Sequence, residues 1–314
     1  MNMRRLLFFI LSFCLIATAA DAQLFGKHKS RSHSRFGRNK PPYRYEMIGS
    51  IGATNFLGDL GGANQIGTHG FKDLNFTCTR PSLGVGMRMK VQQFISAKAN
   101  LFWGDIHGDD KLTQEPFRNA RNLNFRSNIF ELSGQLEFNF IKEQKGHVYA
   151  IKGVRGMKHK DKEIYLFTGG GLVYFNPQGY YDGKWYYLQP LSTEGEGILP
   201  GTKKYSLVTG MVSIGGGMRF AINRYWGVGF EIGLRETFSD YLDDVSGKYP
   251  DPSIFKGNVV AQHLSNPSNA ADANYCYPCA GQQRGDPTHK DAYVFAMFTV
   301  GYKVMHKKRS RSKF

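Results

Sequence analysis

Long apolar segments are scarce in this 314-residue sequence, whose mean hydropathy is −0.40. A protein built from several membrane-spanning helices is excluded, because each such helix needs about 20 consecutive apolar residues. Proline and cysteine are also few, at 12 and four residues. Glycine is plentiful, at 37 residues, and so are Phe and Tyr, at 24 and 17. That composition excludes general disorder and favours an all-β protein, such as a barrel.

The first 22 residues have the pattern of a secretory signal peptide. Arg4 and Arg5 precede an apolar run from Leu6 to Ala19, and Ala20-Asp21-Ala22 is a small-residue cleavage site. We expect cleavage after residue 22, which leaves a basic extension over residues 23–44. The alternative is an uncleaved membrane anchor, which the shortness of the apolar run disfavours.

Two of the cysteines outside this segment, Cys276 and Cys279, have the C-x-x-C spacing. They lie in a polar stretch rich in Asn and Pro rather than at a strand-to-helix junction, so thioredoxin-like redox activity is not expected. In an oxidising compartment the pair is a candidate disulfide, or else two free thiols. A zinc site is the alternative, with His263 and His289 as the nearest further ligands.

Apolar and polar residues alternate with a period of two in eight segments, which predicts eight β-strands. In the clearest segment, Trp226 to Phe238, every second residue is large and apolar, and the others are mostly Gly, Glu and Arg. The eight segments are residues 45–53, 83–91, 95–103, 129–140, 164–175, 208–220, 226–238 and 292–304. We therefore predict an all-β fold over residues 45–304: an eight-stranded antiparallel transmembrane β-barrel with long extracellular loops.

The polar faces of these segments carry charges of both signs. The charged residues are Arg88, Lys90, Lys98, Glu131, Glu137, Arg219, Glu231 and Arg235. A soluble sandwich would have to bury these charges or expose the opposite apolar stripes to water, and both are costly. In a barrel within lipid the charges share one lumen and can pair there. We therefore expect a filled lumen and no general diffusion pore.

The predicted connections alternate between long and short, which indicates an orientation. Residues 54–81, 104–126, 176–205 and 239–290 form long connections, whereas those near Gln92 and Asn223 are very short. Among the connections on the short side, only 142–162 is longer than a turn. Outer-membrane barrels have short periplasmic turns and long extracellular loops. We therefore expect both termini to lie in the periplasm.

Basic residues are concentrated in three segments that this topology places on the periplasmic side. Residues 23–45 contain seven Lys and Arg, residues 142–162 contain seven, and residues 303–314 contain six, against two acidic residues in total. Solvated tails attracted to lipid headgroups would explain the charge, and so would docking to an acidic periplasmic partner. We do not expect nucleic-acid binding by an exported protein with lipid-facing strands. The candidate partner-binding residues are Lys152, Arg155, Lys158, Lys160, Lys162, Lys307, Lys308 and Arg309.

Two motifs carry a resemblance to a known family. The first predicted strand runs into Gly58-Asp59-Leu60-Gly61-Gly62, and the seventh runs out through Asp240-Tyr241-Leu242-Asp243-Asp244. With the last strand, these motifs resemble the PorG-type outer-membrane β-barrel family of Bacteroidetes, which is associated with type IX protein secretion and gliding motility. The resemblance covers most of residues 43–304. It implies a non-enzymatic structural protein without a cofactor, beside a periplasmic ring lipoprotein and its associated secretion subunits.

The chain departs from the family pattern in three places. These are the long basic extension, an insertion around Cys276 and Cys279 in the 239–290 loop, and a basic tail over residues 305–314. Asp240, Asp243 and Asp244 lack the spacing of an EF-hand, so turn-forming aspartates are favoured over a Ca²⁺ site.

The leading hypothesis is a structural barrel of the type IX secretion machinery that anchors or positions a periplasmic lipoprotein ring through its basic face. The alternative is a small outer-membrane transport or surface-binding barrel that acts through its extracellular loops. A secreted enzyme with a barrel fold is a third possibility, but no Ser–His pair or phosphate loop in a suitable context supports it.

Overall fold

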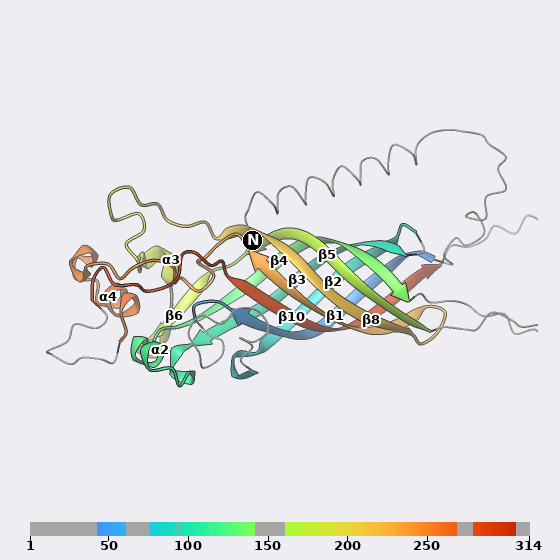
Figure 1. The fold of residues 1–314 in the computed structure, drawn as a ribbon, viewed down its shortest axis with the longest axis horizontal. Coiled ribbons are helices and arrows are strands. Elements are labelled where there is room, and N and C mark those ends of the chain that lie inside the picture. The colour runs from blue at the N-terminus through green and yellow to red at the C-terminus, as the bar shows by residue number, and fades with distance from the viewer. Residues whose placement is uncertain (1–42, 61–75, 93, 142–160, 269–278, 306–314) are drawn as a thin grey trace, which may run out of the picture. The chain divides into compact units, whose positions relative to one another are not determined.

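The computed structural model describes residues 43–60, 76–92, 94–141, 161–268 and 279–305, which all lie in one compact unit (Figure 1). These residues form ten β-strands. They are β1 (Tyr43–Leu57), β2 (Arg80–Lys90), β3 (Ile95–Asp109), β4 (Asn124–Ile141), β5 (Lys162–Tyr174), β6 (Pro177–Tyr181), β7 (Lys184–Tyr187), β8 (Val208–Ala221), β9 (Trp226–Thr237) and β10 (Ala292–Met305). Within the described residues, no helix is long and apolar enough to cross a membrane.

Eight of the described strands close into an antiparallel barrel. Their order around the wall is β3-β2-β1-β10-β9-β8-β5-β4, and pairing between β3 and β4 closes the ring. The remaining strands, β6 and β7, form a hairpin attached to β4. The predicted fold class and all eight predicted strands are therefore confirmed. Several strands extend further than predicted: β1 runs on to Leu57, β3 to Asp109, and β4 begins at Asn124.

Side chains in the barrel strands alternate between the outside of the barrel and its lumen. The outward residues are large and apolar, as at Ile51 and Phe140, whose exposed fractions are 63% and 67%. On β4 the outward apolar residues run from Phe130 to Phe140. With the rise and tilt of barrel strands, that run is about 25 Å tall, the height of the apolar band of outer-membrane barrels. The eight charges predicted for the lumen all lie on its inner face.

The long connections contain secondary structure that was not predicted. They contain short helical segments in addition to the β6–β7 hairpin: η3 (Phe76–Cys78), η4 (Asp110–Leu112), α2 (Pro116–Arg121), α3 (Leu188–Leu191), η5 (Pro252–Phe255) and α4 (Val259–Ser265). We call the described parts of these connections the cap (residues 54–60, 76–81, 104–128, 175–207, 238–268 and 279–291). Figure 1 shows α2, α3, α4 and β6 gathered at one end of the barrel. The opposite end, where short connections join β2 to β3 and β8 to β9, is called the turn end.

Apolar residues from the cap and from the adjoining barrel mouth share one core. Phe56, Phe125, Leu188, Leu242 and Leu264 belong to a single buried cluster that draws on strands and connections alike. The core holds the cap on the barrel, because each connection contributes apolar area that would otherwise meet water. Local caps fix the helices: the Glu115 carboxylate accepts a hydrogen bond from the backbone N–H of Arg118 at 2.7 Å, at the start of α2.

Candidate functional site

Near the turn end, the lumen is filled by a network of buried ion pairs in which each arginine pairs with more than one glutamate. Arg88 Nη1 lies 2.7 Å from Glu46 Oε2, and Arg88 Nε lies 2.7 Å from Glu137 Oε2. Arg219, on β8, reaches the same two glutamates at 3.2 and 3.4 Å. Glu163 completes the network by pairing with Arg219 at 3.3 Å. Because these residues come from β1, β2, β4, β5 and β8, the network joins opposite walls of the barrel.

A second set of charges fills the lumen closer to the cap. Lys98 Nζ on β3 lies 2.7 Å from Glu231 Oε2 on β9, which also accepts a hydrogen bond from the Tyr165 hydroxyl at 2.9 Å. Arg235 Nε lies 3.4 Å from Glu131 Oε2, which accepts a hydrogen bond from the Tyr293 hydroxyl at 3.0 Å. The lumen is thus occupied by paired side chains rather than by an open path.

The two family motifs meet in the cap. The backbone N–H of Leu60, in the first motif, donates to Asp243 Oδ2, in the second, at 3.0 Å. The Asp59 carboxylate accepts a hydrogen bond from the backbone N–H of Asp286 at 2.6 Å. Gly58 lies at the same turn, beside Asp291. Gly61 and Gly62 lie outside the described residues.

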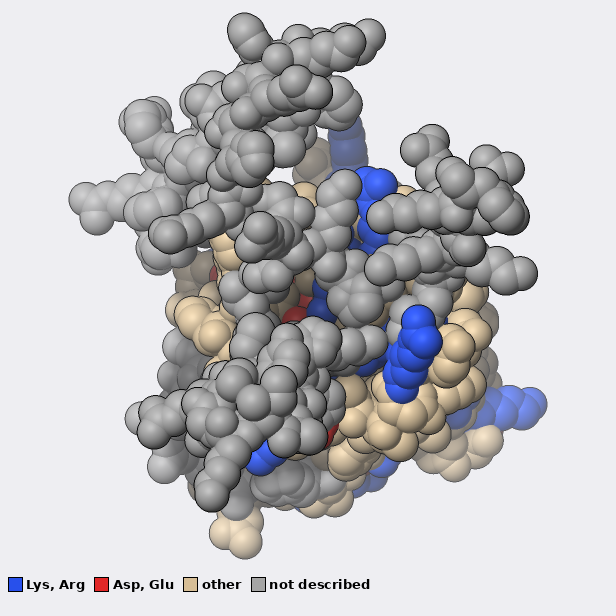
Figure 2. Space-filling view, turned by 90° about the vertical axis from the view of Figure 1, so that its right-hand side faces the viewer, with Lys and Arg blue, Asp and Glu red and all other residues tan. Residues whose placement is uncertain are grey.

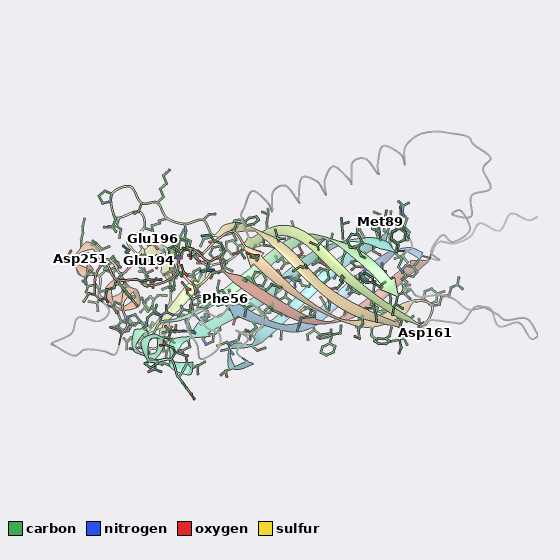
Figure 3. The ribbon with its side chains drawn as sticks, viewed as in Figure 1. Phe56, Met89, Asp161, Glu194, Glu196 and Asp251 are labelled. Carbon is green, nitrogen blue, oxygen red and sulfur yellow. The ribbon has the colours of Figure 1, made fainter. Side chains whose placement is uncertain are left out.

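Arg284 is the centre of the cap's buried polar cluster. Its Nη1 lies 3.0 Å from Glu194 Oε1, and its Nε donates to the carbonyl of Ser265 at 3.2 Å. Nη1 also donates to the carbonyl of Asp244. The Asp244 carboxylate accepts hydrogen bonds from the Tyr205 hydroxyl at 2.6 Å and from the Thr193 hydroxyl. Figure 3 places Glu194 in the cap, far from Met89 at the turn end.

A second arginine ties the neighbouring connections to this cluster. Arg121, in the last turn of α2, lies 2.7 Å from Asp110 Oδ2. Its Nη1 donates to the carbonyl of Arg284 at 2.8 Å, and its Nη2 donates to the carbonyl of Asp59 at 2.7 Å. One guanidinium therefore joins three of the cap segments: 54–60, 104–128 and 279–291.

Acidic groups outnumber these two arginines in the cap. Burial raises the pKa of Asp240 to about 7 and, against the opposing attraction of Arg284, raises that of Asp244 to about 8. Burial also raises the pKa values of Asp243 and Asp291, with a further contribution from neighbouring carboxylates. One buried oxygen of Asp240, Oδ2, accepts no hydrogen bond from the described residues. The cap therefore binds protons more tightly when it is folded than when it is open.

Of the aspartates in the second motif, Asp243 acts in a turn, and Asp291, immediately before β10, makes a similar contact to the backbone of the motif. Asp243 Oδ1 accepts a hydrogen bond from the backbone N–H of Val245 at 3.0 Å. Asp291 Oδ2 accepts one from the backbone N–H of Leu242 at 2.8 Å. Across the described ranges, no group of three or more His, Cys, Asp or Glu residues is arranged to hold a metal ion.

Most of the candidate partner-binding residues lie outside the described residues. These are Lys152, Arg155, Lys158, Lys160, Lys307, Lys308 and Arg309, so their role stays a prediction, as do the signal peptide and most of the basic extension. Lys162 is described, as the exposed first residue of β5. Cys279 is disulfide-bonded, but its predicted partner Cys276 lies outside the described residues. Cys78 is a buried free thiol.

Several site residues were not predicted. Glu46 and Glu163 belong to the lumen network. Glu46 lies within the predicted segment 45–53, whereas Glu163 lies one residue before the predicted segment 164–175, and neither was assigned to the lumen. Arg121, Glu194 and Arg284 lie in stretches without periodicity, so only the chemistry of buried pairing identifies them.

An eight-stranded antiparallel barrel with an apolar outer band and an ion-paired lumen is a transmembrane β-barrel of the outer-membrane type. Comparison with known proteins adds the family. The chain belongs to the family described as a domain of unknown function (DUF6089), whose model matches residues 45–266. No curated protein matches the chain.

Among solved structures, the chain is similar to small bacterial barrels. OprG from Pseudomonas aeruginosa is 10% identical with a TM-score of 0.37, over 84% of this chain and 98% of that one. Neisserial surface protein A is 6% identical with a TM-score of 0.36, over 83% of this chain and 96% of that one. Ail of Yersinia pestis is 7% identical with a TM-score of 0.35, over 83% of this chain and 99% of that one. Likenesses at this level transfer no function to this chain.

Proposed function

We propose that the chain is a structural outer-membrane barrel of the type IX secretion machinery, as its resemblance to the PorG-type family implies. In this proposal its basic periplasmic face anchors or positions a periplasmic lipoprotein ring and the associated secretion subunits. The observation that carries the structural role is the filled lumen. The Lys98–Glu231 pair and the Arg88–Glu46–Glu137–Arg219 network cross the barrel and leave it a rigid wall instead of a conduit.

The orientation follows the lengths of the connections. The cap lies outside the cell, the turn end lies in the periplasm, and both termini lie in the periplasm after removal of the signal peptide. The basic segments over residues 23–44, 142–162 and 305–314 then share the periplasmic side. Figure 2, which views the turn end, shows Lys and Arg side chains standing out there and few acidic ones. A surface of this charge suits an acidic partner and would speed its association.

Catalysis has no part in the proposal. The titratable residues of the lumen are ion-paired across the barrel, as Glu137 is to Arg88 and Arg219. In the cap, Asp243 accepts hydrogen bonds from the backbone of Leu60 and Val245, and Glu194 pairs with Arg284. Both sets of contacts are structural.

Cross-linking in intact cells tests the docking. We expect cross-links from Lys158, Lys160, Lys307 or Lys308 to a periplasmic ring lipoprotein. Changing Lys152, Arg155 and Lys162 together to Glu keeps the reporting lysines in place, and it should abolish those cross-links and impair secretion. The matched control changes three exposed cap lysines, Lys203, Lys248 and Lys256, to Glu. This control has the same net charge as the first variant and should leave both the cross-links and secretion intact.

Cross-links only to abundant envelope proteins, with normal secretion by the first variant, would remove the docking proposal. The second candidate function would then gain: a surface-binding barrel acting through its extracellular loops. One observation favours that candidate, namely that the cap is folded around its own apolar core and ion pairs. Reproducible channel conductance by the purified chain would favour the transport form of this alternative.

A further inference from the structure

The β6–β7 hairpin continues the barrel wall beyond the end of β5. The pairing between β4 and β5 ends at Phe130 and Tyr174, and β6 then takes the place beside β4 through Ser127 and Arg126. The hairpin turns at Asp182 and Gly183, whose φ values of 46° and 78° are those of a tight type I′ turn. The hairpin therefore has one face toward the cap core and one face that prolongs the outer wall.

The two faces of the hairpin differ in what they contact. On the inner face, Tyr181 and Tyr186 pack against the cap core, and the Tyr181 ring lies 4.2 Å from the ring of His263. The outer face, which we call the hairpin outer face, carries three aromatic residues and two polar ones from three adjacent strands. Its residues are Arg126, Gln178, Tyr180, Trp185 and Tyr187. Tyr180 and Tyr187 are 47% and 52% exposed.

Arg126 has unused hydrogen-bonding capacity on this face. Its guanidinium carbon lies 4.1 Å from the centroid of the Trp185 ring, and its Nε donates to Gln178 Oε1 at 2.9 Å. No described carboxylate forms an ion pair with it, and its Nη1 and Nη2 have no acceptor within the described part of the chain. On the neighbouring strand β3, Asp105 attracts Arg126 electrostatically without forming an ion pair with it, and His107 is the in-register partner of Arg126. Stacking and the Nε bond therefore hold the guanidinium in place with its outer edge free.

The hairpin outer face lies just beyond the apolar band. Phe130 is the outward apolar residue of β4 that lies nearest the cap. Arg126 is four residues earlier in the sequence, on the same outward face, and is therefore closer to the cap. That step is about 10 Å along the barrel axis, which places Arg126 at the level of lipid headgroups. Tyr and Trp also favour this level, because each has an apolar ring and a polar hydrogen-bonding group.

We propose that the hairpin outer face binds the phosphorylated sugar headgroup of a glycolipid in the surrounding outer leaflet. The inference rests on the proposed function for the outer membrane and for the orientation of the cap. Arg126 would hold a phosphate through two parallel hydrogen bonds from its free guanidinium edge. The exposed rings of Tyr180 and Tyr187 would stack on the flat faces of the sugars. Continuity of this face with the lipid-facing wall selects a membrane glycolipid over a soluble sugar phosphate.

Fluorescence of the full chain in lipid nanodiscs tests this proposal. The sequence has three Trp, so W103F combined with W226F leaves Trp185 as the only reporter. We expect phosphorylated lipopolysaccharide to change the Trp185 emission saturably. R126Q should raise the half-saturating concentration about tenfold. R126K keeps the charge without the planar fork and should give an intermediate value. The matched control is R224Q, which removes an arginine from the exposed β8–β9 turn and should change nothing.

Comparison ligands separate the sources of phosphate. Phosphatidylglycerol, inorganic phosphate and dephosphorylated lipopolysaccharide should each bind at least about tenfold more weakly than the phosphorylated glycolipid. An equal response to phosphatidylglycerol or to inorganic phosphate would overturn the proposal, and so would unchanged binding by R126Q. Y187A should also weaken binding of the phosphorylated glycolipid. This variant keeps the stacked pair of Arg126 and Trp185, so a loss of affinity could not be blamed on unfolding of the hairpin.

The outcome is separable from that of the proposed function. The measurement uses purified chain without any periplasmic partner, so a failed glycolipid response leaves the docking proposal standing. Cross-links to a lipoprotein ring could still be found in that case. A chain that does not insert into lipid bilayers at all would instead overturn both proposals.

Discussion

Replacement of Arg284 by Met should open the cap without unfolding the barrel. Met has a similar length and no charge, so the change removes the guanidinium while keeping most of the packing. It leaves the carboxylates of Glu194 and Asp244 buried without their cation and the carbonyl of Ser265 without its donor. The effect should be confined to the cap, because none of these partners lies in a barrel strand.

The size of the effect follows from the burial of the pair. Arg284, Glu194 and Asp244 are all almost inaccessible to solvent. Removing one partner from such a pair costs about 3–5 kcal/mol, because the other charge stays buried and uncompensated. Protonation of Asp244, whose pKa burial already raises to about 8, offsets part of that cost near neutral pH. We therefore expect the free energy of cap opening to fall by about 3 kcal/mol.

Hydrogen exchange followed by mass spectrometry measures this opening segment by segment. A loss of about 3 kcal/mol accelerates exchange by more than about 100-fold in cap peptides that exchange through opening, such as 239–250. Peptides from β4 and β9 should keep their protection. R224M is the control, since Arg224 is exposed in a turn at the other end. Unchanged cap exchange in R284M, or equal loss of protection in the barrel strands, would refute the reasoning.

Three further predictions follow from the same contacts. Burial raises the pKa of Asp240 to about 7, so the contribution of this group to cap stability is fully present below its usual pKa of about 4 and is lost as the pH rises through about 7. Hydrogen exchange of cap peptides, corrected for intrinsic rates, should therefore accelerate between pH 6 and 8.5. The acceleration should be smaller in D240N. R88A leaves Glu46 and Glu137 buried with fewer partners and should lower barrel stability by about 3 kcal/mol. The measurement is the temperature at which the folded band disappears on a gel, and the control R224A should leave that temperature unchanged. The wild-type chain should show no stepwise conductance in planar bilayers, because Lys98 and Glu231 meet across the lumen; steady steps would contradict a filled barrel.

The barrel could be predicted from the sequence because its rule is local. Each strand must present apolar residues to lipid and small or charged ones to the lumen, so alternation is visible in every segment by itself. Glu131, Glu137 and Arg235 were placed correctly for that reason, but which charges pair with one another was not predicted. Partners depend on which strands face each other across the lumen, and the period of one strand does not contain that information.

The cap could be predicted only in part. Asp182-Gly183 between aromatic residues is a hairpin signal that would have located β6 and β7 within the connection 176–205. The Arg284 cluster had no comparable signal. Arg284 and Glu194 are 90 residues apart, and their pairing depends on how four separate connections fold over one barrel mouth.

The lumen ion pairs are better explained by the register they impose than by the stability they add. Buried ion pairs can often be replaced by apolar residues without loss of stability, so stability alone gives no reason for so many charges. A one-residue slip of any strand, however, would turn its lumen charges toward lipid. An Arg or Lys turned toward lipid costs about 2–4 kcal/mol at the bilayer midplane and less toward its faces, and at least one of the eight predicted lumen charges lies on each of β2, β3, β4, β8 and β9. Charges that pair across the lumen therefore fix one register and leave no open path through the barrel.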